Sequence, residues 1–127
     1  MILSFKSQQV KGAGRGKLLG YPTLNMDIPE EFQLEDGIFA VWVKISGRKM
    51  MGAMHFGAVP TFDQAKKSLE VFLLDVADKD FEKLDTSQIL IDVVSWLRGI
   101  MRFRNSEELS DQIRKDVVQV RRVMGSE

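Results

Sequence analysis

The sequence predicts one mainly β domain, a small antiparallel barrel or sandwich with a helix at its C-terminal end. About five or six segments have the β-branched and aromatic composition of strands. One segment, close to the C-terminus, repeats apolar residues at helical spacing. The 127 residues suit a single core, so we expect residues 1–127 to form one domain. An open sheet with two apolar faces would expose its edges, which favours closure.

The expected strands cover residues 2–10, 25–28, 37–45, 49–56, 69–75 and 88–98. The third of these is the clearest, because Phe39, Val41 and Val43 alternate on one face. Ser46-Gly47 directly after it predicts a tight hairpin. The polar stretch 76–87 is expected to be a loop.

The helix is expected to begin near residue 106 and to run for about 18 residues. Asn105 or Ser106 provides the N-cap, and two glutamates follow in the first turn. Arg121 and Arg122 lie in the last turn, where the helix dipole favours positive charge. The apolar stripe consists of Leu109, Ile113, Val117, Val120 and Met124.

Composition excludes several classes of protein. Lys plus Arg and Asp plus Glu both number 18, so the formal net charge is zero. Dedicated nucleic-acid and anionic-membrane binders are usually basic, and we therefore expect neither partner. The chain has no cysteine, which excludes disulfides and thiolate metal sites and fits a reducing compartment. No signal peptide or membrane-spanning run is evident, so we expect a cytoplasmic location. We also expect the protein to be a monomer.

Residues 11–25 form the most informative segment. Its glycines and basic residues include Gly12, Gly14, Arg15, Gly16 and Lys17. Backbone N–H groups of such a loop can turn inward and bind phosphate. Thr23 and Asn25 follow with neutral oxygens of the kind that Mg²⁺ accepts. The alternative is a glycine-rich turn without a ligand, in which the Thr and Asn side chains form hydrogen bonds with the local backbone.

Glu70 is the best candidate for acid–base chemistry. It shares a strand face with Phe72 and Leu74, so it is either a carboxylate at a cleft or a carboxylate at a barrel rim, exposed or paired with a lysine. His55 is the single histidine. We expect a structural role for it, because no Cys or carboxylate stands at metal-ligand spacing.

Two further candidate residues lie near the C-terminus. Phe103 stands between Arg102 and Arg104 just before the helix, which makes it a candidate for lining a pocket. Asp116 lies within the expected helix, where a charged side chain is usually exposed to solvent.

Taken together, these motifs resemble the ATP-dependent riboflavin kinase (flavokinase) family. The family's opening motif is close to Gly-x-Gly-Arg-Gly-Arg/Lys-x-Leu-Gly-Phe/Tyr-Pro-Thr-Ala-Asn, and residues 12–25 read GAGRGKLLGYPTLN. The sequences DGIFA at 36–40, GAVPTF at 57–62 and LEV at 69–71 follow in the family's order. The similarity runs from about residue 8 to 123.

The resemblance implies a closed six-stranded Greek-key barrel with a C-terminal helix. It also implies transfer of the ATP γ-phosphoryl group to riboflavin, which gives FMN, with Mg²⁺ as the metal. Glu70 would be the base, Thr23 and Asn25 the ligands of metal and phosphate, and the loop at 12–17 the nucleotide site. The flavin side would be formed by Arg98, Phe103 and Asp116.

The sequence departs from the family pattern at four places. Leu24 replaces the usual alanine, Phe72 replaces a common histidine, Ile100 replaces an acid, and residues 80–83 lack the usual loop glycine. The competing hypothesis is therefore a barrel of the same fold that binds a flavin or nucleotide without turnover. Because the chain starts at its own methionine, we expect no adenylyltransferase domain and FMN rather than FAD as product.

Overall fold

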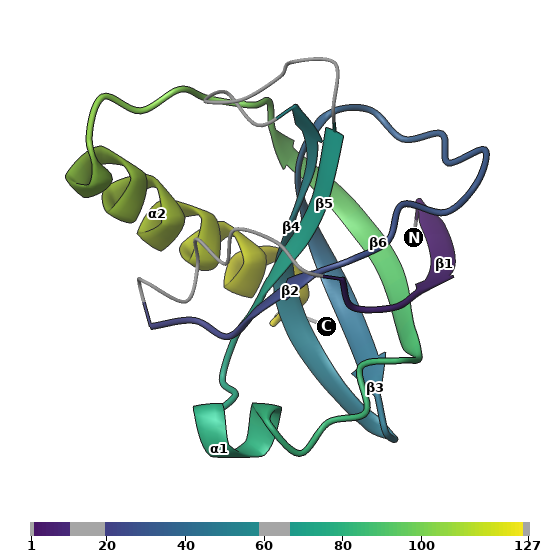
Figure 1. Ribbon diagram of the computed structural model, residues 1–127. Helices are drawn as coiled ribbons and strands as arrows, with labels where there is room; N and C mark the ends of the chain where they lie inside the picture. The colour runs from purple at the N-terminus through teal and green to yellow at the C-terminus, as the bar shows by residue number, and fades with distance from the viewer. Residues whose placement is uncertain (1, 11–19, 59–66, 126–127) are drawn as a thin grey trace.

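The computed structural model describes residues 2–10, 20–58 and 67–125. Six strands and two helices lie in this part of the chain (Figure 1). They are β1 (Leu3–Ser7), β2 (Thr23–Asn25), β3 (Gly37–Ile45), β4 (Arg48–Ala58), β5 (Lys67–Leu73), α1 (Asp78–Phe81), β6 (Ile89–Arg98) and α2 (Ser106–Met124).

The strands form one antiparallel sheet in the order β1-β6-β3-β4-β5-β2. The prediction of a mainly β fold with six strands and a C-terminal helix is confirmed. The closed barrel is not shown, because the described residues form a half-barrel whose edge strands β1 and β2 do not pair along their length. An isolated bridge between Gln9 and Met26 joins the two edges. β2 has only three residues, which is too short to extend that bridge into a ladder.

Most elements lie close to their predicted positions, and β2 and the segment 76–87 differ most. β2 begins at Thr23, ahead of the predicted segment 25–28, and so includes both residues of the expected metal site. The predicted loop 76–87 contains the single-turn helix α1, which was missed. One turn is too short to show apolar periodicity, and its N-cap Ala77 makes no side-chain capping bond.

Both faces of the central part of the sheet are buried, which explains why β3, β4 and β5 carry apolar residues on both sides. The concave face holds Phe39, Val41 and Val43, as the alternation predicted. The opposite face includes Ala40 and Ala53 and packs against α2, which lies along one side of the sheet (Figure 1). The helix contributes Ile113, Val117, Val120 and Met124 to this second layer.

The predicted hairpin and helix cap both form. Ser46 and Gly47 have φ values of 52° and 79°, the two positive values that a type I′ turn requires. The Asn105 side chain caps α2 by accepting a bond from the Glu108 backbone N–H at 2.9 Å. Neither helix in the described part of the chain has the length and apolar character to cross a bilayer.

Gly37 lies where β3 meets β6, and we expect Gly37→Ala to destabilise the fold. Its φ is 152°, and an added Cβ would lie 2.6 Å from the Arg98 carbonyl oxygen and against the Trp96 indole nitrogen. Overpacking of this kind typically costs about 1–3 kcal/mol, and the unusual backbone conformation adds to it. Urea unfolding would measure the decrease in the free energy of unfolding.

Gly99 provides the matched control for this substitution. A Cβ added at this residue would have no atom within 4 Å, and no positive φ is found there, so Gly99→Ala should leave the free energy of unfolding nearly unchanged. Equal stability of the two variants would contradict the proposed clash at Gly37.

A two-pronged ion pair joins the C-terminal end of α2 to Asp75, two residues after the end of β5. Arg121 donates from Nη1 and Nη2 to the Asp75 carboxylate, both at 2.8 Å. These hydrogen bonds lower the pKa of the Asp75 carboxyl below its ordinary value. Its contribution to stability is therefore complete above the ordinary carboxyl pKa and is lost as pH falls through the lowered value.

We expect Asp75→Asn to cost less than about 1 kcal/mol at neutral pH, because the pair is largely exposed to solvent. Asparagine tolerates the positive φ of 59° at this position. Unfolding measured from neutral to acidic pH should show the two proteins converging in acid. A stability difference independent of pH would contradict the assignment.

Candidate active site

One row of side chains crosses five strands on the face that α2 covers. The strand register pairs Asn25 with Glu70, Glu70 with His55, His55 with Ile38, and Ile38 with Arg98. Directly paired residues point to the same side of a sheet, with Cβ atoms about 4.5–5.5 Å apart. Their chain neighbours, such as Leu24 and Val71, occupy the concave core. We call these five residues the cross-strand row.

Glu70 stands in the interior of this row. Its side chain is buried, with a relative exposure of 2%, and its Oε1 atom is shielded from solvent. The form of the rim alternative in which Glu70 is exposed is therefore wrong. The register places Asn25 on one side of Glu70 and His55 on the other, so a buried carboxylate lies between two polar side chains.

Thr23 and Asn25 form an oxygen-rich end beside Glu70. They lie two residues apart on β2, so both side chains point to the same face. The Thr23 hydroxyl donates to the Tyr21 carbonyl at 3.1 Å, which leaves its oxygen lone pairs for an acceptor role. Amide and hydroxyl oxygens suit Mg²⁺, which usually completes its shell with water and substrate phosphates.

The two neutral side chains of Thr23 and Asn25 are too few to hold Mg²⁺ without further ligands. No cluster of three or more His, Cys, Asp or Glu side chains suited to a metal occurs among the residues that the structure describes. The residues of the predicted phosphate loop lie outside those described: Gly12, Gly14, Arg15, Gly16 and Lys17.

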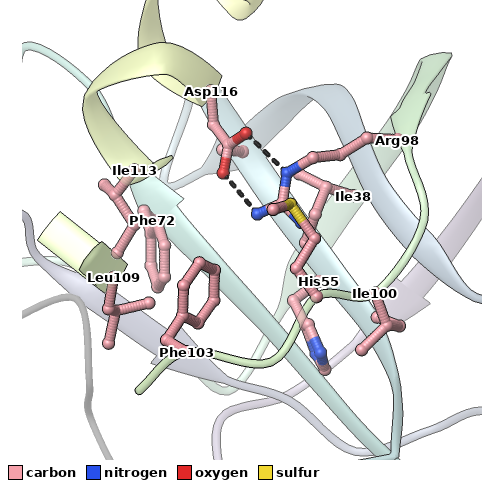
Figure 2. A pocket seen from close by; sticks show the side chains of 11 residues that line it. Ile38, His55, Phe72, Arg98, Ile100, Phe103, Leu109, Ile113 and Asp116 are labelled. Atoms are coloured by element: carbon pink, nitrogen blue, oxygen red, sulfur yellow. Dashed lines mark hydrogen bonds and ion pairs between the residues drawn. The ribbon is translucent and has the colours of Figure 1, made fainter. Parts of the chain in front are cut away.

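The other end of the row opens into a pocket between the sheet and α2 (Figure 2). Its cavity volume is about 40 Å³, which leaves room for a few water molecules at most. Figure 2 shows the Phe103 ring facing this space together with Phe72. The lining residues are Ile38, Ala53, His55, Phe72, Arg98, Ile100, Met101, Phe103, Leu109, Ile113 and Asp116.

An ion pair closes one wall of this pocket. Arg98 donates from Nε and Nη2 to the two carboxylate oxygens of Asp116, each at 2.8 Å. Gln112 donates to the same carboxylate at 3.0 Å. Asp116 is buried, with 3% exposure, so its expected solvated position is wrong. Its place between Ile113 and Val117 puts it on the inward face of α2, where it can meet Arg98.

The structure therefore brings six of the predicted site residues to one face. Thr23, Asn25 and Glu70 form the polar end, while Arg98, Phe103 and Asp116 border the pocket. His55 was assigned a structural role from the sequence, and its position in the row was missed. The only signal that could have revealed it is the strand register, which pairs it with Glu70.

The family model described as riboflavin kinase (flavokinase) matches residues 2–124. One similar protein is the RNA-binding riboflavin kinase RibR of Bacillus subtilis, 34% identical over 110 residues, which cover 85% of this chain and 45% of that protein. Another is the bifunctional riboflavin kinase/FMN adenylyltransferase of Escherichia coli K12. It is 31% identical over 117 residues, covering 91% of this chain and 36% of the relative.

A solved structure described as a macrolide-efflux protein from Streptococcus pneumoniae has a similar fold. The TM-score is 0.78 at 25% identity, covering 94% of this chain and 38% of that one. The chain spans less than half the length of each of these relatives. The family match nevertheless extends over almost all of its residues, and the chain belongs to the riboflavin kinase family.

Proposed function

We propose that this protein is a riboflavin kinase that transfers the γ-phosphoryl group of ATP to the terminal ribityl hydroxyl of riboflavin. The observation that carries the proposal is the cross-strand row. It leads from an oxygen-rich end at Asn25, past the buried carboxylate of Glu70, to an apolar pocket at Arg98. Phosphoryl transfer needs this kind of alignment more than covalent chemistry from the protein.

The pocket would hold the flavin ring. Phe72, Phe103 and two aliphatic side chains of α2 offer the flat apolar contacts that an aromatic ring needs. Arg98, held by Asp116, adds a fixed group of hydrogen-bond donors at one wall. Because the present cavity of about 40 Å³ is too small for a three-ring system, we expect the segment carrying Phe103 to move outward on binding.

The opposite end would receive the triphosphate. Thr23 and Asn25 would hold Mg²⁺, and the loop at residues 12–17 would surround the phosphates. When bound, Mg²⁺ neutralises the charge on the transferring phosphoryl group. The neutral oxygens of Thr23 and Asn25 suit this role, because substrate phosphates and water complete the shell.

Glu70 would orient the terminal ribityl hydroxyl and accept its proton as the oxygen attacks the γ-phosphorus. The bond between that phosphorus and the β–γ bridging oxygen breaks, and ADP leaves. Burial of Glu70 favours this role, since few water molecules can compete for its oxygens. The neighbouring positions of Asn25 and Glu70 on paired strands place the base beside the proposed metal ligand.

One assay tests the proposal against a barrel that binds flavin without turnover. The protein is incubated with riboflavin, ATP and Mg²⁺, and the flavins are separated by chromatography. We expect FMN to accumulate with an equal amount of ADP. Riboflavin binding without any FMN would overturn the kinase proposal and favour the binding module.

We also expect Asn25→Ala to weaken the use of MgATP. Losing one oxygen ligand should raise the KM for MgATP and the Mg²⁺ concentration needed for half-maximal rate, by roughly tenfold or more. Steady-state kinetics at varied Mg²⁺ concentration would measure this. Asp27→Ala, two residues further along and exposed, is the matched control. An unchanged Mg²⁺ dependence in Asn25→Ala would contradict the metal assignment.

A further inference from the structure

His55 is the middle residue of the cross-strand row. Asn25 and Glu70 lie on one side of it, and Ile38 and Arg98, which line the pocket, lie on the other. His55 pairs with Glu70 on one neighbouring strand and with Ile38 on the other. Adjacent strands of a sheet lie about 4.8 Å apart. Its side chain also lines the pocket. A ligand that reaches from the pocket to Glu70 must therefore pass along the His55 side chain.

The chemistry of this position is unlike that of its neighbours in the pocket. His55 is buried, with 8% exposure, and most other residues that line the pocket with it are apolar, among them Ile38, Ala53 and Ile100. Its Nδ1 lies 3.5 Å from the Ser68 hydroxyl, so a second polar side chain bears on the orientation of the ring. A neutral imidazole has one donor and one acceptor nitrogen, which suits hydroxyl groups.

We propose that His55 recognises the ribityl hydroxyls and thereby selects flavins that carry a polyol chain. This inference rests on the proposed function, because it takes the pocket as the ring site and Glu70 as the site of the terminal hydroxyl. When the flavin ring binds between α2 and the sheet, its ribityl chain passes His55 on the way to Glu70. Hydrogen bonding at this point fixes the chain so that its last hydroxyl meets Glu70.

The test compares riboflavin with lumiflavin, which has the same ring with a methyl group in place of the ribityl chain. We expect His55→Leu to weaken riboflavin binding about tenfold, the effect of losing one buried hydrogen bond, and to leave lumiflavin binding unchanged. His55→Asn, which keeps a donor and an acceptor, should recover most of the loss. Fluorescence titration measures both affinities, and Met51→Leu on the same strand is the control for repacking.

Equal weakening of both flavins, or of neither, in His55→Leu would overturn the inference. So would a fall in kcat with unchanged riboflavin affinity, because His55 would then act only through Glu70. If the parent forms FMN while the affinity ratio is insensitive to His55, the inference alone fails. If the parent forms no FMN but prefers riboflavin through His55, the kinase proposal alone fails.

The native protein permits a second measurement that does not depend on a variant folding. The sequence contains one histidine, so selective ¹⁵N-histidine labelling gives ring signals from His55 alone. We expect riboflavin to shift these signals well beyond the shift caused by lumiflavin. Identical shifts with the two flavins would overturn the inference.

Discussion

Glu70→Gln is expected to reduce kcat at least about 100-fold, the lower end of what general-base catalysis contributes. The amide keeps the shape of the carboxylate but cannot take a proton from the attacking hydroxyl. Flavin binding should persist, because the pocket proposed to hold the ring lies at the other end of the row. Rates at saturating riboflavin and MgATP, with a fluorescence titration of riboflavin, separate the two effects.

Glu107→Gln is the matched control for this substitution, since Glu107 lies exposed in the first turn of α2. It should turn over at the parent rate. A Glu70→Gln variant that is nearly as active as the parent would remove Glu70 from the role of base. Loss of riboflavin binding in the same variant would instead place the carboxylate at the ring site.

Asp116→Ala is expected to lower the free energy of unfolding by about 3 kcal/mol. The substitution leaves the Arg98 guanidinium against an apolar pocket without the carboxylate that it now contacts through two bonds. The side-chain exposure of Arg98 is 19%, so water offsets part of the cost and the estimate lies at the lower end of the usual range. Chemical denaturation would measure the loss.

Two comparisons sharpen this prediction. Asp111→Ala removes an ion pair with Arg114 on the solvent side of the same helix, and it should cost less than about 0.5 kcal/mol. The double variant Arg98→Leu with Asp116→Leu should recover much of the stability, because it removes both buried charges. Equal costs for Asp116→Ala and Asp111→Ala would show that the buried pair contributes little.

The sheet and the final helix could be predicted because their signals are local. Alternation over 37–45 and the stripe along α2 depend on side chains that follow one another in the chain. The capping bond of Asn105 and the type I′ turn at Ser46-Gly47 are local as well. Closure of the barrel is a different kind of property, since it depends on how two short edge strands meet across the fold.

The site was predictable only in part, for a related reason. Residue chemistry identified Glu70 and Asn25, and a resemblance identified Arg98, yet spacing alone could not place them in one row. Asp116 and His55 were judged from residue type, whereas their surroundings depend on what lies opposite them. Arg98 faces Asp116 from β6, and Glu70 faces His55 from β5. Register and crossover connections decide such contacts, and no short sequence pattern encodes them.

The most direct measurement is a crystal structure of the protein with riboflavin, ADP and Mg²⁺. The cross-strand row predicts the flavin ring between α2 and the sheet, the polyol chain beside His55, and the terminal hydroxyl within about 3.2 Å of the Glu70 carboxylate. The metal should contact Thr23 and Asn25. A flavin bound outside the pocket, or a terminal hydroxyl directed away from Glu70, would contradict the account.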